Sequence, residues 1–207
     1  LVDVNVTSLT DEVLAWADYA FISSMVVQRT SAQQIIKRCK ELGVKVVAGG
    51  PLFTSEHEQF ENVDHFVLNE AELTLPPFLE DLNNNCAKRV YSTSHFADIQ
   101  KTPAPLWELA DLRQYASMSI QYTRGCPYHC EFCNVTSLFG RNPRTKTPEQ
   151  IVAELDSFYR MGWRGSVFFV DDNLIGNKKS LKNQLLPALI KWQREHVPIP
   201  FNTEVSI

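Results

Sequence analysis

The stretch YTRGCPYHCEFCNV, residues 122–135, places Cys126, His129, Cys130 and Cys133 within eight consecutive positions. It lies at the end of a strand-like run, MSIQYTRG. Thiols spaced i, i+4 and i+7 on a loop after a strand can surround one inorganic centre from one side and leave the other side open. The spacing therefore indicates a metal centre with a vacant position, where chemistry can take place.

Two other interpretations of this loop stay open. His129 could complete a structural zinc site, although such sites usually take two ligand pairs from separated segments. A redox dithiol would need only two of the cysteines. An odd total of five cysteines argues against a disulfide framework. We interpret Cys39 as a buried helix residue and Cys86 as an incidental loop thiol.

Composition and charge exclude several classes of protein. The chain has 207 residues, a hydrophobic fraction of 44% and a net charge of -4, which suits a globular protein and disfavours a nucleic-acid surface. No apolar run approaches the roughly 20 residues of a membrane span, and no leader is evident, so we expect a cytoplasmic protein. The chain begins at Leu1 and reads as a piece of something longer.

The residues after the cysteines alternate between helix and strand patterns. A capping box at Thr147 and Gln150 begins a helix whose buried stripe is Ile151, Val152, Leu155, Phe158 and Tyr159. GSVFFVDDN is the next strand, a helical region broken at Pro187 follows, and FNTEVSI is a third strand. Residues 120–207 therefore predict the start of a parallel β/α barrel or part-barrel, C-terminally incomplete.

The first 86 residues show a similar alternation. Short helices separate the strand-like runs, which are LVDVNV, YAFISSMVV, VKVVAGG and HFVLNEAE. Continuous apolar strands between amphipathic helices indicate a parallel sheet covered on both faces. Residues 1–86 thus predict a Rossmann-like or flavodoxin-like α/β domain, N-terminally incomplete. Residues 87–119 are polar and proline-rich, and we interpret them as a connector that packs through Trp107 and Leu109.

The pattern C-x3-C-x2-C, with Phe132 before the last cysteine, closely resembles the signature of the radical SAM superfamily. The resemblance implies that Cys126, Cys130 and Cys133 bind a [4Fe-4S] cluster and that S-adenosylmethionine chelates the fourth iron. It also implies that Phe132 lies near the adenine. Barrel active sites lie at the carboxyl ends of the strands, where this loop is predicted to be.

The family's second strand normally ends in a Gly-Gly-Glu-like motif that holds the methionyl amine. Here the corresponding residues are Asp171, Asp172 and Asn173, which keep the acidic character and lose the glycines. They are candidate S-adenosylmethionine contacts, although helix capping is an alternative role. Glu204, on the third strand, is a candidate ribose or substrate contact. The sequence names no catalytic acid, base or nucleophile.

Residues 1–86 resemble the cobalamin-binding domain of one radical SAM branch, through FISSM at 21–25, VVAGGP at 46–51 and LNEAE at 68–72. Backbone that approaches the cofactor's nucleotide tail needs small residues at strand ends. The candidates are Ser23, Ser24, Gly49 and Gly50. The Asp-x-His-x-x-Gly motif of other cobalamin proteins is not seen.

The segments DDNLIGNKK and TPAPLWEL further resemble the hopanoid methylase-like group. The resemblance implies an enzyme that cleaves S-adenosylmethionine to a 5'-deoxyadenosyl radical and transfers a methyl group through cobalamin to an unreactive carbon. An electron-donor protein and a small-molecule substrate are the implied partners, and the isolated chain is expected to self-associate or lose its cluster. Non-methylating chemistry and a metal-stabilised scaffold without catalysis are the alternatives.

Overall fold

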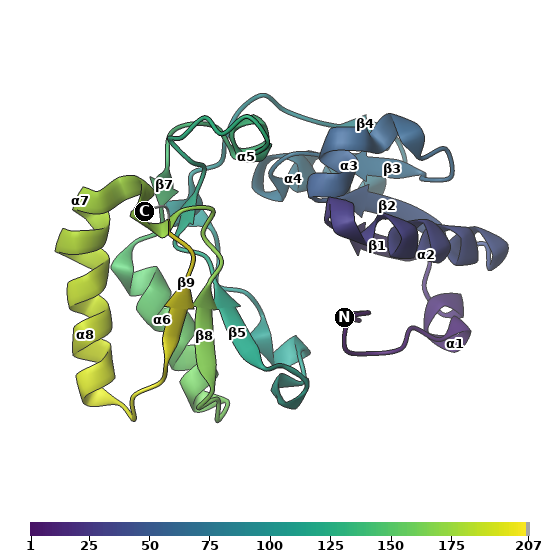
Figure 1. Cartoon of the computed structure of the whole chain (residues 1–207). Coiled ribbons are helices and arrows are strands. Elements are labelled where there is room, and N and C mark those ends of the chain that lie inside the picture. Colours follow the sequence, from purple (N-terminus) through teal and green to yellow (C-terminus); the bar gives the residue numbers. More distant parts are fainter. Residues whose placement is uncertain (206–207) are drawn as a thin grey trace. The chain divides into compact units, whose positions relative to one another are not determined.

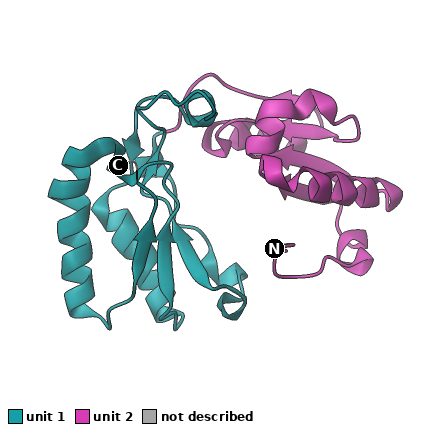
Figure 2. Cartoon of the chain, in the orientation of Figure 1, with its two compact units in different colours: residues 1, 98–207 teal, residues 2–97 magenta. Residues whose placement is uncertain are grey.

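The computed structural model describes residues 1–205 and divides into two compact units (Figure 2). The first unit comprises residues 2–97, and the second comprises the chain from Asp98 onward together with Leu1. The boundary falls inside the segment predicted as a connector. Both units contain parallel sheets and helices, so the predicted α/β class is confirmed.

The first unit is built on a four-stranded parallel sheet in the order β1-β2-β3-β4 (Figure 1). Its strands are β1 (Tyr19–Ser23), β2 (Lys45–Gly49), β3 (His65–Val67) and β4 (Val90–Tyr91). Its helices are α1 (Asp11–Ala15), α2 (Arg29–Glu41), α3 (Pro51–Glu56) and α4 (Ala71–Asn83). Because all four strands are parallel, their carboxyl ends meet at one edge of the sheet.

Alternate residues of the central strands face two separate cores. Val46 and Ala48 pack in the cluster that α1, α2 and α3 complete, whereas Val47 and Val67 pack with Phe78 of α4. Since successive strand residues point to opposite faces, an unbroken apolar strand is what this arrangement requires. The prediction of a sheet covered on both faces is confirmed for these strands.

Two sequence-based expectations for this unit were wrong. LVDVNV does not form a strand: the Asp3 carbonyl accepts the N–H groups of Val6 and Thr7, and the segment turns. The predicted connector, in contrast, supplies β4, which pairs with β3. A strand needs a partner to supply its hydrogen bonds, and alternation of valines by itself does not provide one.

The second unit has a three-stranded parallel sheet in the order β5-β8-β9 (Figure 1) and a short antiparallel pair. The strands are β5 (Ser117–Ile120), β8 (Ser166–Phe169) and β9 (Phe201–Thr203), and the pair is β6 (Thr123–Arg124) with β7 (Arg144–Thr145). The helices are α5 (Val135–Phe139), α6 (Pro148–Arg160), α7 (Lys178–Ser180) and α8 (Leu186–Glu195), with a π-helical turn at Leu181–Leu185. The predicted third strand ends at Thr203, and its last two residues, 206–207, lie outside the described part.

The helices α6 and α8 cover one face of this sheet. Ile151, Leu155 and Phe158 of α6 are fully buried in the cluster that also contains Leu189 and Trp192 of α8. The predicted capping box is confirmed, because the Thr147 hydroxyl and the Gln150 side chain bond each other's backbone N–H groups. The helix restarts at Pro187, as predicted: Pro187 is the second residue of α8, directly after the π-helical turn, and the first turn of a helix tolerates a proline.

The surface of this unit also bears on the predictions. Trp107 packs against Phe158, but Leu109 is exposed, so only the tryptophan of the predicted pair anchors the connector.

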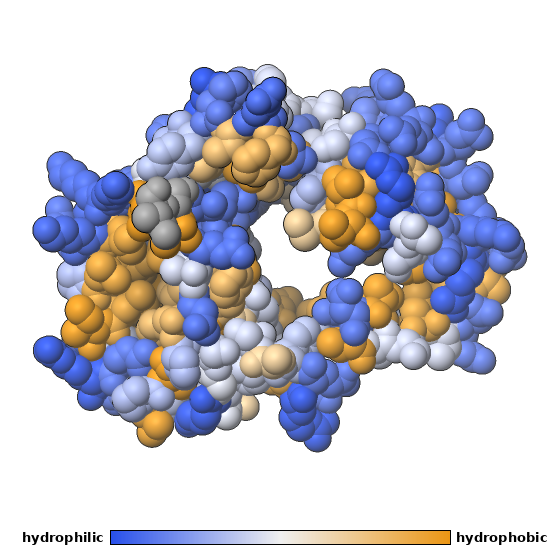
Figure 3. Space-filling model, viewed as in Figure 1, coloured by the Kyte–Doolittle hydropathy of each residue, from blue (hydrophilic) through white to orange (hydrophobic). Residues whose placement is uncertain are grey.

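Apolar residues gather over α8 (Figure 3), where Leu186 and Ile190 are exposed. Across residues 1–205, we find no helix with the length and apolar character of a membrane span.

Candidate functional site

The three clustered cysteines lie on one loop at the carboxyl edge of the second unit's sheet. We define the cysteine loop as residues 125–143, between β6 and β7. At its base the Lys146 N–H donates to the Tyr122 carbonyl at 2.9 Å, and within it the Cys126 N–H donates to the Gly140 carbonyl at 3.2 Å. The loop is therefore closed at its base by backbone hydrogen bonds and projects from the strand ends.

The cysteine thiols are free and unevenly exposed. Cys126 and Cys133 are half-buried and Cys130 is exposed. Within residues 1–205, no three His, Cys, Asp or Glu side chains lie close enough together to hold a metal ion. Three thiols are nevertheless the donor set that iron-sulfur clusters take. Phe132, the predicted adenine neighbour, is 93% exposed.

The histidine of this loop pairs with a residue from the loop's far end. The His129 Nδ1 lies 2.8 Å from the Arg141 guanidinium. Since arginine can only donate, Nδ1 accepts and the proton of the neutral ring lies on Nε2. This contact joins the two halves of the cysteine loop.

The three predicted contact residues that follow β8, at 171–173, have different environments. Asp171 is 4% exposed, and its carboxylate accepts the Tyr122 N–H at 3.2 Å and the Thr123 N–H. Burial raises the pKa of Asp171, and these hydrogen bonds oppose the rise. Asp172 is exposed and accepts the N–H of Gly125. Asp171 and Asp172 thus both contact the chain that leads into Cys126.

The third of these residues, Asn173, caps the turn that follows it. Asn173 is buried, and its side-chain oxygen caps the following 3₁₀ turn by accepting the Ile175 N–H at 3.2 Å. Helix capping, the alternative read from the sequence, is therefore present at Asn173. Glu204 is exposed just beyond β9 and lies on the same carboxyl edge.

A buried ion pair near the base of the loop was missed by sequence reasoning. Lys146 and Glu154 are both nearly inaccessible, and their side chains meet at 2.5 Å. Burial raises the pKa of Glu154, while the Lys146 ammonium opposes the rise. The available signal was the place of Glu154 on the apolar stripe of α6, three residues after Ile151.

In the first unit, the predicted cofactor residues lie together at the carboxyl ends of β1 and β2. A Cβ on Gly49 would lie 2.7 Å from the Val67 carbonyl oxygen, and one on Gly50 would lie 2.8 Å from the Ser23 hydroxyl. Packing within the protein therefore already requires both glycines. Ser24 differs, because its hydroxyl is buried and has no hydrogen-bond partner.

The LNEAE segment, at the same edge, holds the start of the connector. Glu70 is 3% exposed, and its carboxylate accepts the Ala97 N–H at 2.6 Å. The Asn69 side chain accepts the Thr93 N–H at 3.1 Å. This segment therefore has a role inside the protein in addition to any role toward a cofactor.

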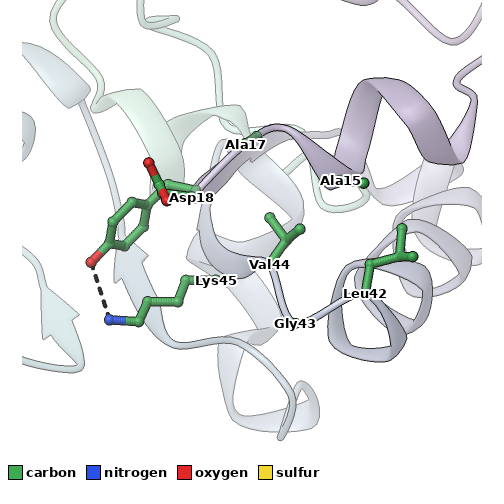
Figure 4. A pocket seen from close by; sticks show the side chains of 8 residues that line it. Ala15, Ala17, Asp18, Leu42, Gly43, Val44 and Lys45 are labelled. Atoms are coloured by element: carbon green, nitrogen blue, oxygen red, sulfur yellow. Dashed lines mark hydrogen bonds between the residues drawn. The ribbon is translucent and has the colours of Figure 1, made fainter.

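A pocket of about 560 Å³ opens at the opposite edge of this sheet, where β1 and β2 begin (Figure 4). Asp18 and Lys45 are its charged lining residues, and the Lys45 ammonium lies 3.4 Å from the Tyr19 hydroxyl. Ligands of open parallel sheets bind outside the carboxyl ends of the strands. The pocket contains none of the predicted cofactor residues.

Known proteins resemble this chain over most of its length. Residues 120–189 match the model of the radical SAM superfamily. The chain is 45% identical over its whole length to an uncharacterised methyltransferase of Synechocystis sp., of which it covers 39%. It is 40% identical over 93% of its length to the hopanoid C-2 methylase of Rhodopseudomonas palustris, of which it covers 37%. The chain thus spans about two fifths of the length of these relatives.

A solved structure shows the same fold. It is the radical S-adenosylmethionine methyltransferase TsrM from Kitasatospora setae with cobalamin and a [4Fe-4S] cluster bound. The TM-score is 0.69 at 14% identity, and the match covers 90% of this chain and 44% of that one. The predicted resemblance to hopanoid methylases is confirmed by the second relative, and the radical SAM superfamily match lies in residues 120–189, which contain all three clustered cysteines.

Proposed function

We propose that the full-length protein is a radical SAM methyltransferase that uses a [4Fe-4S] cluster and cobalamin to methylate an unreactive carbon. The observation that carries this proposal is the cysteine loop, whose three free thiols project from the carboxyl edge of a parallel sheet. An electron-donor protein and a small-molecule substrate belong to the same proposal.

Cys126, Cys130 and Cys133 would hold the cluster. When bound, it supplies the electron that cleaves S-adenosylmethionine into methionine and a 5'-deoxyadenosyl radical. The exposed ring of Phe132 is free to pack on the adenine, because no other side chain covers it. The cysteine loop would thus provide both the thiolates and an apolar contact.

The residues that follow β8 would contribute unequally to binding S-adenosylmethionine. Asp172 has an exposed carboxylate beside the Gly125 N–H, at the start of the cysteine loop. We assign it the methionyl amine, since a carboxylate favours an ammonium group. Glu204, which is exposed on the same edge, is assigned to the ribose or substrate.

The first unit would hold cobalamin at the carboxyl ends of β1 and β2. The support from this chain is the Ser24 hydroxyl, a buried polar group that needs a partner. Gly50 packs closely against this site, because a Cβ on it would lie 2.8 Å from the Ser23 hydroxyl and 3.1 Å from the Ser24 carbonyl oxygen, and Gly49 likewise adds no side chain at the edge. The bound cobalamin of TsrM, a protein of the same fold, supports the same assignment.

The cluster is tested by metal analysis of the full-length protein purified without oxygen. We expect about four irons per chain and formation of 5'-deoxyadenosine from S-adenosylmethionine. Cys126→Ser, Cys130→Ser and Cys133→Ser should each lower both to background. Cys86→Ser is the matched control, because this thiol is also exposed but lies in the other unit. A colourless protein with one zinc would contradict the proposal.

Cobalamin is tested separately by titrating the full-length protein with hydroxocobalamin and following its visible spectrum. Ser24→Ala should weaken binding, because alanine removes only the hydroxyl and adds no bulk. Val27→Ser, at a fully exposed position of the same unit, serves as the control. Cleavage of S-adenosylmethionine without a methylated product would favour the non-methylating alternative.

A further inference from the structure

The second unit contains a buried carboxylate that binds backbone N–H groups at the base of the cysteine loop. Asp171 lies two residues after the end of β8 and is 4% exposed. One of its oxygens accepts the Tyr122 N–H at 3.2 Å, and the other accepts the Thr123 N–H. Both oxygens are therefore occupied by the backbone of the segment that enters the cysteine loop.

These two N–H groups lie beyond the end of the β5-β8 ladder, so β8 offers them no backbone acceptor. The ladder between β5 and β8 ends at Ile120, whose carbonyl accepts the Val170 N–H at 2.9 Å. Tyr122 and Thr123 are both completely buried, so water cannot replace a missing acceptor. Asp171 supplies the acceptors at the point where the chain leaves the sheet.

The position of these bonds fixes the base of the loop. The carbonyl of Tyr122 accepts the Lys146 N–H, and Thr123 pairs with Thr145 in the β6-β7 ladder. Asp171 therefore links the segment after β8 to β6, and through the β6-β7 ladder to β7. Its bond to Thr123 lies three residues before Cys126. The segment after Asp171 also packs against the loop, because a Cβ on Gly176 would lie 3.3 Å from Pro127.

We propose that Asp171 is a positioning residue that holds the entry of the cysteine loop against β8 and so sets where Cys126 stands, without touching S-adenosylmethionine. The exposed neighbour Asp172 is left for the ligand. The consequence for the cluster rests on the proposed function, but the anchoring itself is a property of the metal-free chain.

Hydrogen exchange in the metal-free, full-length protein tests the anchor directly. In Asp171→Ala, the amides of Tyr122 and Thr123 should exchange about ten- to hundredfold faster, the expected effect of losing a hydrogen bond to a charged acceptor. Asp171→Asn should give a smaller increase, because its carbonyl oxygen can still accept one of the bonds. The core amides of Leu155 and Phe158 should keep their rates.

Two variants serve as controls. Asp172→Asn removes the adjacent carboxylate and should leave the Tyr122 and Thr123 amides protected. Asp156→Asn alters a carboxylate of the same unit that accepts the Trp192 indole N–H at 2.7 Å, and should likewise leave them protected. Faster exchange throughout the unit in Asp171→Asn would overturn the proposal, because it would show general destabilisation in place of a local anchor.

The cysteine itself gives a second measurement. Cys126 should be alkylated faster in Asp171→Asn than in the parent protein, relative to Cys86 as an internal reference. In reconstituted protein, the same variant should retain iron but alter the electron paramagnetic resonance spectrum of the reduced cluster. Unchanged exchange and alkylation with weakened S-adenosylmethionine binding would instead make Asp171 a ligand contact. If iron never binds, the proposed function fails while the exchange result still decides the anchor.

Discussion

Both units fasten neighbouring parallel strands with a carboxylate that accepts backbone N–H groups, but they do so at opposite edges of their sheets. In the first unit, Asp64 precedes β3 and accepts the Val46 N–H at 2.7 Å. In the second, Asp171 follows β8 and accepts from Tyr122 and Thr123. The edge that carries the long cysteine loop is thus the one with the buried anchor.

The two carboxylates differ in charge environment. Asp64 is partly exposed and its side chain lies 3.1 Å from the Lys40 ammonium. Burial by itself would raise the pKa of Asp64, but the Val46 N–H, Lys40 and the nearby His65 more than offset it, and the pKa is lowered. At Asp171 burial prevails and the pKa is raised. The same kind of backbone contact therefore accompanies a lowered carboxyl pKa in the first unit and a raised one in the second.

The largest effect is expected at a third carboxylate, Glu154, which is as buried as Asp171 but has a cation. Glu154→Gln leaves the Lys146 ammonium buried without its counter-charge, which should lower the free energy of unfolding by about 3–5 kcal/mol. Urea unfolding of the full-length protein measures it. Glu149→Gln, on the exposed side of the same helix, should have almost no effect. Equal losses in the two variants would show that the buried pair contributes nothing specific.

The carboxyl edge of the first unit should respond to added bulk. Gly50 has φ 86° and ψ -179°, a conformation nearly restricted to glycine, so Gly50→Ala should cost about 1–3 kcal/mol. Gly43→Ala is the matched control, because Gly43 also has a positive φ but open space around its Cα. Thermal unfolding compares the two variants. A smaller loss at Gly50 than at Gly43 would mean that packing against Ser23 does not hold this edge.

Replacing Asp64 tests the pH difference between the anchors. Because the folded-state pKa of Asp64 is lowered, its stabilisation is present above the unfolded pKa of about 3.9 and is lost as the pH falls below it. Asp64→Asn should therefore cost about 1 kcal/mol at pH 7 and progressively less below pH 4. Thermal unfolding at several pH values measures this. Asp11→Asn removes an exposed partner of Arg38 and controls for loss of charge. A loss that stayed constant with pH would contradict the assignment.

The smallest effect is expected from the cation beside Asp64. Lys40→Gln should reduce stability by less than about 1 kcal/mol, since the pair is partly exposed. It should nevertheless move the pKa of Asp64 upward, toward the behaviour of Asp171. An NMR titration of the Asp64 carboxyl follows this shift. Lys37→Gln, which removes a more exposed pair with Glu41, should leave the Asp64 titration unchanged. If Lys40→Gln also left it unchanged, the difference between Asp64 and Asp171 would not come from Lys40.

Much of the fold could be predicted because it depends on local pattern. The apolar runs of β1, β2 and β8, the cap at Thr147 and the restart at Pro187 all follow from neighbouring residues. LVDVNV was mistaken for a strand because pairing is a long-range property. The two-residue β4 was missed because its short run carries no periodicity.

Only part of the candidate site could be predicted from the sequence. The cysteine spacing is a local signal and places the loop correctly after β5. The separate environments of Asp171, Asp172 and Asn173 depend on contacts with residues about fifty positions earlier and on a local cap. No spacing rule distinguishes them, so the sequence grouped together three side chains that the fold separates.

The β6-β7 ladder has one further consequence, for the length of the segment that it closes. Its ends are already joined by the pairs Thr123 with Thr145 and Arg124 with Arg144, so the entropy of closing the chain is met whether or not metal is bound. Doubling the length of such a closed segment costs only about 0.6 kcal/mol. We therefore expect the region between Gly125 and Pro143 to accept insertions away from the cysteines without disturbing the sheet beneath.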